Sequence, residues 1–156
     1  MIRINSITLL CFITGLAAYS QSEVSVWKTH FNVDNTGLAI QGYDPVSYFG
    51  SNGPQEGKEE LSYEFRDITY RFVSSGSLDN FMASPEKYEP EYGGWCAYAM
   101  GESGEEVKID PETFKIIDGK LYLFYNFLFN NTLKDWNDDE KHLKLKADKS
   151  WKMIIN

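Results

Sequence analysis

Two segments of alternating apolar and polar residues set the strongest limit on the fold of this chain. Residues 61–72 (LSYEFRDITYRF) alternate on both sides of the Arg-Asp pair 66–67, and residues 114–125 (FKIIDGKLYLFY) flank the Asp-Gly pair 118–119. A period of two is typical of strands with one buried face, and Asp-Gly readily adopts the positive φ values of tight hairpin turns. The sequence therefore predicts two β-hairpins and an antiparallel sheet.

Helical signals lie between the hairpins and after them. Leu78, Phe81 and Met82 fit one face of a short helix that must end before Pro85, because proline lacks a backbone donor and disfavours helical geometry in the residue before it. After the second hairpin, apolar residues recur at steps of three and four, which predicts a helix face packed on the core. These residues are Leu143, Ala147, Trp151 and Ile154.

The start of this tail helix has its own signal. Residues 137–140 (NDDE) form a capping-box pattern in which Asn is the N-cap and Glu stands at the third helical position. Residues 50–60 and 101–106 are typical of loops. A shorter helix before the tail is indicated by apolar residues at similar spacing: Phe129, Leu133 and Trp136. We expect an α+β fold, with a small antiparallel sheet built from hairpins, a short middle helix, and C-terminal helices packed on the sheet.

Composition sets the size of the core and excludes some functions. The 156 residues suit one domain, and 42% hydrophobic with 15% aromatic residues supply enough apolar material for one core. A formal net charge of −8 argues against a nucleic-acid partner, because phosphate binding needs clustered Lys and Arg. Two Cys and two His are too few for a zinc-finger array or a dense disulfide framework.

The first twenty residues have the pattern of a secretory signal peptide. Arg3 supplies a basic start, residues 7–18 form a short apolar run, and Ala18 and Ser20 stand at the two positions that a signal peptidase reads. The run is short for a membrane span, and the alternative is an uncleaved anchor or a buried helix. We expect a cleaved signal peptide over residues 1–20 and a single domain over residues 21–156. The mature protein would be exported, periplasmic or extracellular, without a stable membrane anchor.

Cleavage would leave a single thiol. It removes Arg3 and no acidic residue, so the net charge of −8 becomes −9, and it also removes Cys11. One cysteine cannot close an internal disulfide in an oxidising compartment. Cys96 is therefore expected to be buried as a structural residue, paired with a second chain in a homodimer, or occupied by a metal.

Further motifs carry a family resemblance. They are residues 42–46 (GYDPV), the strand end 70–72 (YRF), the helix closing with Phe81 and residues 85–88 (PEKY), residues 92–99 (YGGWCAYA) and residues 118–123 (DGKLYL). Over residues 28–151 the chain resembles the YHS-domain proteins, in particular the exported single-domain bacterial branch. The resemblance implies a YHS-type domain with a C-terminal helical extension, in a largely uncharacterised family associated with metal. Related short modules occur in copper-transporting ATPases and in some di-iron hydroxylases.

This chain departs from the metal-associated modules of that family. Those modules carry a Cys after the Asp-Pro-Val, and a Cys pair at the end of the second strand and the start of the helix. This chain has Ser47, Val73 and Ser77 at those positions. Serine is a poor ligand for Cu(I) or Zn(II), and valine is none. Any metal site must therefore be built differently, around Cys96.

The leading hypothesis from the sequence is an exported, non-catalytic YHS-type protein that handles a transition metal, copper rather than zinc. Cys96, His30 and Asp44 offer soft, borderline and hard ligands, which is enough for a site of three. Each residue also has a structural alternative: a buried thiol, an ordinary surface imidazole and a turn-forming carboxylate.

The alternative hypothesis is a small-molecule or protein interaction module in which Cys96 is merely structural. The glycine pair before Trp95 and Cys96 lets the backbone bend sharply or approach another group closely, and aromatic side chains can line a ligand pocket. The expected pocket residues are Tyr43, Tyr48, Gly93, Gly94, Trp95 and Tyr98.

Catalytic patterns are weak in this chain. The sequence contains no G-x-S-x-G, H-E-x-x-H, phosphate-loop or C-x-x-C motif. A dyad of Cys96 and His30 is the remaining arrangement, so a thiol enzyme stays a third alternative.

Overall fold

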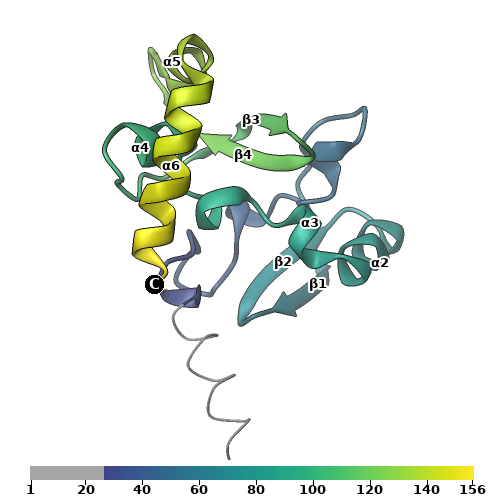
Figure 1. Ribbon diagram of the computed structural model, residues 1–156. Coiled ribbons are helices and arrows are strands. Elements are labelled where there is room, and N and C mark those ends of the chain that lie inside the picture. The colour runs from purple at the N-terminus through teal and green to yellow at the C-terminus, as the bar shows by residue number, and fades with distance from the viewer. Residues whose placement is uncertain (1–26) are drawn as a thin grey trace, which may run out of the picture.

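Residues 27–156 are described in this computed structural model, and the expected signal peptide, residues 1–20, lies outside them. The described chain is an α+β fold with three two-stranded antiparallel sheets and several helices, which confirms the expected fold class. Figure 1 shows two groups of elements, one hairpin with two short helices beside it and a second hairpin next to the C-terminal helices.

The first hairpin pairs β1 (Lys58–Phe65) with β2 (Ile68–Phe72), as the alternation predicted. Its turn residues, 66–67, have φ of 53° and 61°, the left-handed values that match a hairpin turn to the twist of its strands. Because β1 begins at Lys58, the loop expected over residues 50–60 is too long by three residues at its C-terminal end.

The second hairpin pairs β3 (Asp110–Ile117) with β4 (Lys120–Phe124). The turn residues Asp118 and Gly119 have φ of 52° and 74°, so the Asp-Gly pair adopts the geometry that the sequence predicted for it. The register shifts between Asp110, which pairs with Phe124, and Phe114, which pairs with Leu123, so the strand is irregular between these two residues.

Strand β4 separates two apolar clusters. Alternate side chains of a strand point to opposite faces, and the four residues after Lys120 are at most 2% exposed. Leu121 and Leu123 join the cluster built on the first hairpin, whereas Tyr122 and Phe124 join the cluster under the C-terminal helices. Burial on both faces explains why this strand is a continuous apolar run.

The middle helix forms where the sequence predicted it. Helix α2 (Ser75–Ala83) has Ser74 as N-cap, whose side chain accepts a hydrogen bond from the Ser77 N–H. It ends before Pro85, which opens the short helix α3 (Pro85–Tyr88). Phe81 of α2 is fully buried against the rings of the first hairpin, 4.7 Å from Tyr70 between ring centroids.

Three helices form the second group. Helix α4 (Ala97–Glu102) packs against α6 (Glu140–Ile154), and α5 (Thr132–Asp138) lies at one end of α6 (Figure 1). The short helix expected before the tail is α5. The loop expected over residues 101–106 begins later than predicted, because α4 extends to Glu102.

The capping-box prediction at residues 137–140 is wrong. Asn137 lies inside α5, and α6 begins at Glu140 after Asp139, whose side chain makes no cap hydrogen bond. The Glu140 carboxylate instead accepts from the Trp136 indole N–H at 3.2 Å and pairs with Lys115. A local indole and a distant lysine therefore take the side chain that would have completed the box.

The start of the described chain lies beside the C-terminal end of α6 (Figure 1). Trp27 packs edge-on to Trp151 with 6.1 Å between ring centroids. Gly93 makes this contact possible, because a Cβ there would stand 2.7 Å from the Trp151 ring and 2.9 Å from the His30 carbonyl oxygen. Within residues 27–156, no helix combines the length and apolar character needed to cross a bilayer.

The crossing of α4 and α6 predicts opposite effects of two Gly→Ala changes. At Gly101 in α4, a Cβ would stand 2.6 Å from the Leu143 carbonyl oxygen, so Gly101→Ala should lower the free energy of unfolding by about 1–3 kcal/mol. At Gly76 in α2, the nearest atom is the Ser74 Oγ at 3.9 Å, so Gly76→Ala should raise it by about 0.5–1 kcal/mol. Urea unfolding of both variants measures the two effects, and a Gly101→Ala variant as stable as the wild type or more stable would contradict the close crossing.

Candidate functional site

Cys96 stands at the junction of the two apolar clusters. The segment from Pro90 to Cys96 contains η3 (Glu91–Gly94) and runs parallel to β4. Bridges join Pro90 to Leu121 and Cys96 to Leu123. Cys96 is the N-cap of α4, and its N–H donates to the Val107 carbonyl at 2.9 Å. The residue is fully buried, so backbone contacts on both sides hold the thiol in one place.

The thiol makes a closed set of hydrogen bonds. Its Sγ accepts from the backbone N–H of Tyr125 at 3.3 Å and lies 3.4 Å from the Thr132 hydroxyl. The Thr132 hydroxyl donates to the Tyr125 carbonyl at 2.9 Å. Because that donation takes the only hydroxyl hydrogen, the S–H is the donor in the contact between Cys96 and Thr132. The neutral thiol is therefore satisfied as both donor and acceptor, which favours a structural role.

A cavity of about 460 Å³ lies next to this thiol. Ala99 of α4 and Val107 of the following loop give it apolar surface, and Tyr98 and Tyr125 give it aromatic surface. Cys96 forms part of its wall. The sequence predicted Tyr98 as a pocket residue, and it is the member of the expected aromatic set that borders this cavity.

The polar side of the cavity is acidic. Glu102, Glu105, Asn130 and Thr132 also line it, and both carboxylates are on exposed residues. Glu105 accepts from the Ser103 hydroxyl at 3.1 Å and has no ion-pair partner within residues 27–156, whereas the Glu102 carboxylate is 3.9 Å from the Lys146 ammonium. Partial desolvation, and then the charge of Glu102, raise the pKa of Tyr98, so its phenol stays a neutral hydrogen-bonding group.

Part of this cavity was missed by sequence reasoning. Asn130 belongs to the small hairpin of β5 (Asn126–Phe127) and β6 (Asn130–Asn131), a region that the spacing of Phe129 assigned to a helix. Asparagine is a poor residue for a helix interior, so the Asn-Asn pair 130–131 was the available signal against a helix. No local pattern places Thr132 at the thiol, because that contact joins segments 36 residues apart.

Buried Cys96 is predicted to resist thiol reagents. In a chain carrying Cys11→Ser, so that Cys96 is the single thiol, we expect reaction with Ellman's reagent at least about 100-fold slower in buffer than in denaturant, because attack requires local opening. The same sample should show no disulfide-linked dimer on non-reducing electrophoresis. Labelling as fast as in the unfolded chain, or a dimer band, would contradict a buried, hydrogen-bonded thiol.

Asp44, one of the three expected metal ligands, is held in a hydrogen-bond network. Its side chain is fully buried. Oδ1 accepts from the Val46 N–H at 2.8 Å, and Oδ2 accepts from the Val73 N–H at 3.0 Å and from the Ser77 hydroxyl at 2.5 Å. The network joins the turn after Asp44 to the end of β2 and the start of α2. Val73 and Ser77 therefore both contact this carboxylate.

His30 lies at a different place from the other two candidates. Its Nδ1 is 3.1 Å from the Glu106 Oε1, with both side chains about one-third exposed, and its carbonyl accepts from the Trp95 indole N–H at 2.7 Å. His30 does not line the cavity beside Cys96. The structure therefore does not bring Cys96, His30 and Asp44 together, and residues 27–156 contain no group of three or more His, Cys, Asp or Glu side chains arranged to hold a metal ion.

The other expected pocket residues are dispersed. Tyr48 is buried and donates to the Pro111 carbonyl at 2.8 Å. Tyr43 is half-buried, with its phenol oxygen 3.4 Å from the Glu112 carboxylate. Gly94 adopts a φ of +81°, and a Cβ there would stand 3.3 Å from the Pro90 ring. Trp95 is held by the His30 carbonyl, as described above. These residues support the fold rather than one common pocket.

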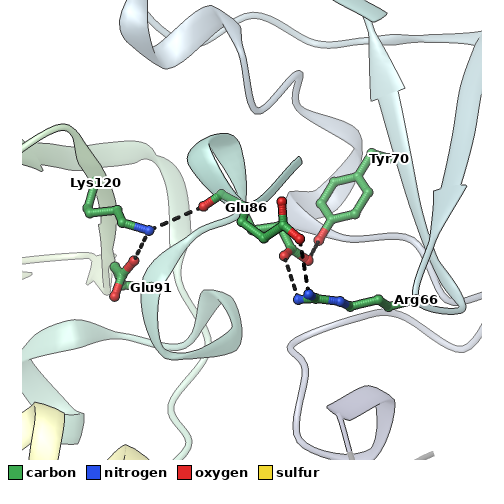
Figure 2. Close-up of polar contacts among 6 residues, drawn as sticks. Arg66, Tyr70, Glu86, Glu91 and Lys120 are labelled. Carbon is green, nitrogen blue, oxygen red and sulfur yellow. Dashed lines mark hydrogen bonds and ion pairs between the residues drawn. The ribbon is translucent and has the colours of Figure 1, made fainter. Parts of the chain in front are cut away.

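A second polar cluster lies between the first hairpin and α3. Figure 2 shows the Arg66 guanidinium facing carboxylates from the α3 region, and Lys120 bound to the Glu86 carbonyl and to Glu91. Arg66 pairs with Glu86 at 3.2 Å and with Glu89 at 3.3 Å, and Tyr70 donates to Glu89 at 3.0 Å. Together with Trp27, Gly93 and Trp151, this cluster borders a cavity of about 160 Å³.

Glu89 is the buried charge of this cluster. Its side chain is 7% exposed. Burial raises the pKa of Glu89 above the ordinary value of a glutamate, while the Tyr70 hydroxyl and the Arg66 guanidinium oppose that shift without cancelling it. Ionisation of Glu89 therefore lowers the free energy of unfolding at neutral pH, whereas the protonated carboxyl carries no such penalty.

This shift predicts a pH-dependent gain for Glu89→Gln. A raised folded pKa contributes stability that is present below the unfolded pKa and is lost as the pH rises through the folded pKa. The unfolding free energy of Glu89→Gln, relative to that of the wild type, should therefore increase between about pH 4 and about pH 7. Glu86→Gln removes an exposed partner of the same Arg66 and should show a smaller change. A relative stability that falls toward neutral pH would contradict the raised pKa.

Comparisons with known proteins add no relative. No family model, no curated protein and no solved structure matches this chain. The resemblance to the YHS-domain proteins therefore stays a prediction from the motifs of the sequence.

Proposed function

We propose that this protein is a non-catalytic binding module that takes a small cationic organic molecule with an apolar or aromatic body into the cavity beside Cys96. The observation that carries the proposal is the cavity itself. Its volume of about 460 Å³ falls within the range of about 300–1,000 Å³ that is usual for small-molecule sites. Two other cavities in the described chain measure about 280 and 160 Å³.

The lining of the cavity supports a ligand with two different ends. Ala99, Val107 and the two tyrosines offer apolar and aromatic contact, whereas the two glutamates offer negative charge at the exposed side. Because Glu105 lacks an ion-pair partner within residues 27–156, its carboxylate is available to an ammonium group. The net charge of −8 for the chain favours a cation further.

Cys96 acts in this proposal as a wall residue and a structural thiol. Its donor and acceptor bonds go to Thr132 and Tyr125, and His30 pairs with Glu106. These contacts support neither a Cys–His dyad nor a metal site of Cys96, His30 and Asp44. Copper handling through Cys96, and export of the mature chain, stay predictions of the sequence.

The charge preference can be tested with two probes of the same skeleton. Tyramine carries an ammonium and 4-hydroxyphenylacetate a carboxylate, so saturation-transfer NMR should show binding of tyramine and weak or absent binding of the acid. Glu105→Gln should weaken tyramine binding by about two- to fivefold, because one exposed charge pair contributes roughly 0.2–1 kcal/mol. Glu106→Gln is the matched control, since the neighbouring Glu106 pairs with His30 and does not line the cavity.

A cavity-filling variant locates the site. Ala99→Leu adds three carbons at a lining position of α4 and should reduce tyramine binding at least about tenfold, since it occupies the ligand volume. Equal binding of both probes, or no effect of Ala99→Leu, would overturn the proposal. Uptake of Cu(I) by the wild type that Cys96→Ser abolishes would instead favour the copper hypothesis.

A further inference from the structure

The β5–β6 hairpin carries an exposed apolar tip. Phe127, Leu128 and Phe129 are consecutive, and their exposed fractions are 62%, 79% and 104%. The other large apolar residues exposed within residues 27–156 are scattered over α2 and α6, and they are Met82, Leu145 and Met153. We call residues 127–129 the apolar tip. Three adjacent side chains of this kind are unusual on a free surface and indicate a contact site.

The backbone of the apolar tip is also unusual. Leu128 has a φ of 54°, a left-handed value at which a side chain other than glycine, asparagine or aspartate is disfavoured. A hairpin turn of two residues normally places glycine or asparagine there. This chain instead has leucine at the point of the turn, so an apolar side chain stands where the local geometry alone would select against it.

Charge is absent from the sequence around the apolar tip. Residues 121–133, between Lys120 and Lys134, contain no Asp, Glu, Lys or Arg, although 24% of the chain is charged. The neighbours of the tip in the hairpin, Asn126 and Asn130, are neutral amides. Insertion of this tip into an apolar medium would therefore require no charged group of the hairpin to lose its water.

The size of the apolar tip distinguishes between two kinds of partner. Two phenylalanines and one leucine present an area on the order of 400 Å², whereas a stable protein interface needs about 800 Å² from each partner. The β5–β6 hairpin itself has only two strands of two residues, so it adds little contact area of its own. A lipid bilayer needs no complementary shape, and aromatic side chains are favoured at its interface.

We propose that the apolar tip docks the protein reversibly on a lipid surface, with Phe127, Leu128 and Phe129 entering the boundary between headgroups and acyl chains. The surface would be zwitterionic, because a net charge of −8 opposes anionic lipid. This inference goes beyond small-molecule binding and does not depend on it, since residues 127–129 do not line the cavity beside Cys96.

Vesicle flotation tests the proposal. The full chain is mixed with phosphatidylcholine vesicles, and with vesicles that also contain phosphatidylserine, and every variant is made in the same chain so that residues 1–26 contribute equally. Leu128→Gly and Phe129→Ser should each lower the partition coefficient on phosphatidylcholine at least about tenfold, because each removes a large apolar side chain from the inserted tip. Phosphatidylserine should weaken binding of the wild type.

Two controls separate docking from misfolding and from general stickiness. Leu128→Gly places glycine at the positive φ, so its thermal midpoint should not fall while vesicle binding is lost. Leu145→Gln removes an apolar residue that is 64% exposed on α6 and should keep wild-type partition. The proposal is overturned if the tip variants bind vesicles like the wild type, or if sedimentation shows that the tip variants dissociate a dimer.

Discussion

Burial of strand β4 on both faces is the constraint on which the rest of the structure depends. Leu121 and Leu123 complete the cluster of the first hairpin, and Tyr122 and Phe124 complete the cluster under α4, α5 and α6. A strand in this position cannot slip by one residue, because a slip would exchange the side chains of the two clusters. The paired register of β3 and β4, set by the Asp118-Gly119 turn, therefore positions both halves of the molecule.

The same strand positions the candidate site. The segment that carries Cys96 runs parallel beside β4, and the chain after β4 returns through Tyr125 to Thr132, so that three separate segments meet at the thiol. Their meeting leaves the 460 Å³ cavity on one side, and the β5–β6 hairpin that lies between Tyr125 and Thr132 carries the apolar tip. Ligand uptake and surface docking would thus be supported by neighbouring parts of one framework.

The buried carboxylate of Asp44 connects three segments of the described chain. The backbone N–H of Val73 and the hydroxyl of Ser77 both donate to this carboxylate. A carboxylate that accepts from three donors holds the turn, the strand end and the helix start together. Asp44 is accordingly a structural residue of the described chain, which explains why its position before Pro45 looked like a turn signal and a ligand signal at once.

Local pattern was enough to predict the two hairpins, their turns, the helix before Pro85 and the apolar face of the tail, because these features depend on neighbours in the chain and on side-chain period. The capping box failed because α5 continues through Asn137, so that this residue is not a helix start, and because Glu140 binds Trp136 and Lys115. The metal ligands Cys96, His30 and Asp44 were predicted from the ligand properties of their side chains, and those properties do not determine which residues lie close together in the fold. Long-range packing around β4 placed these three residues apart and brought Tyr125, Thr132 and Glu105 to the cavity instead. Only the tertiary structure could decide this, because the residues of a site come from segments far apart in the chain, and local sequence patterns do not predict such contacts.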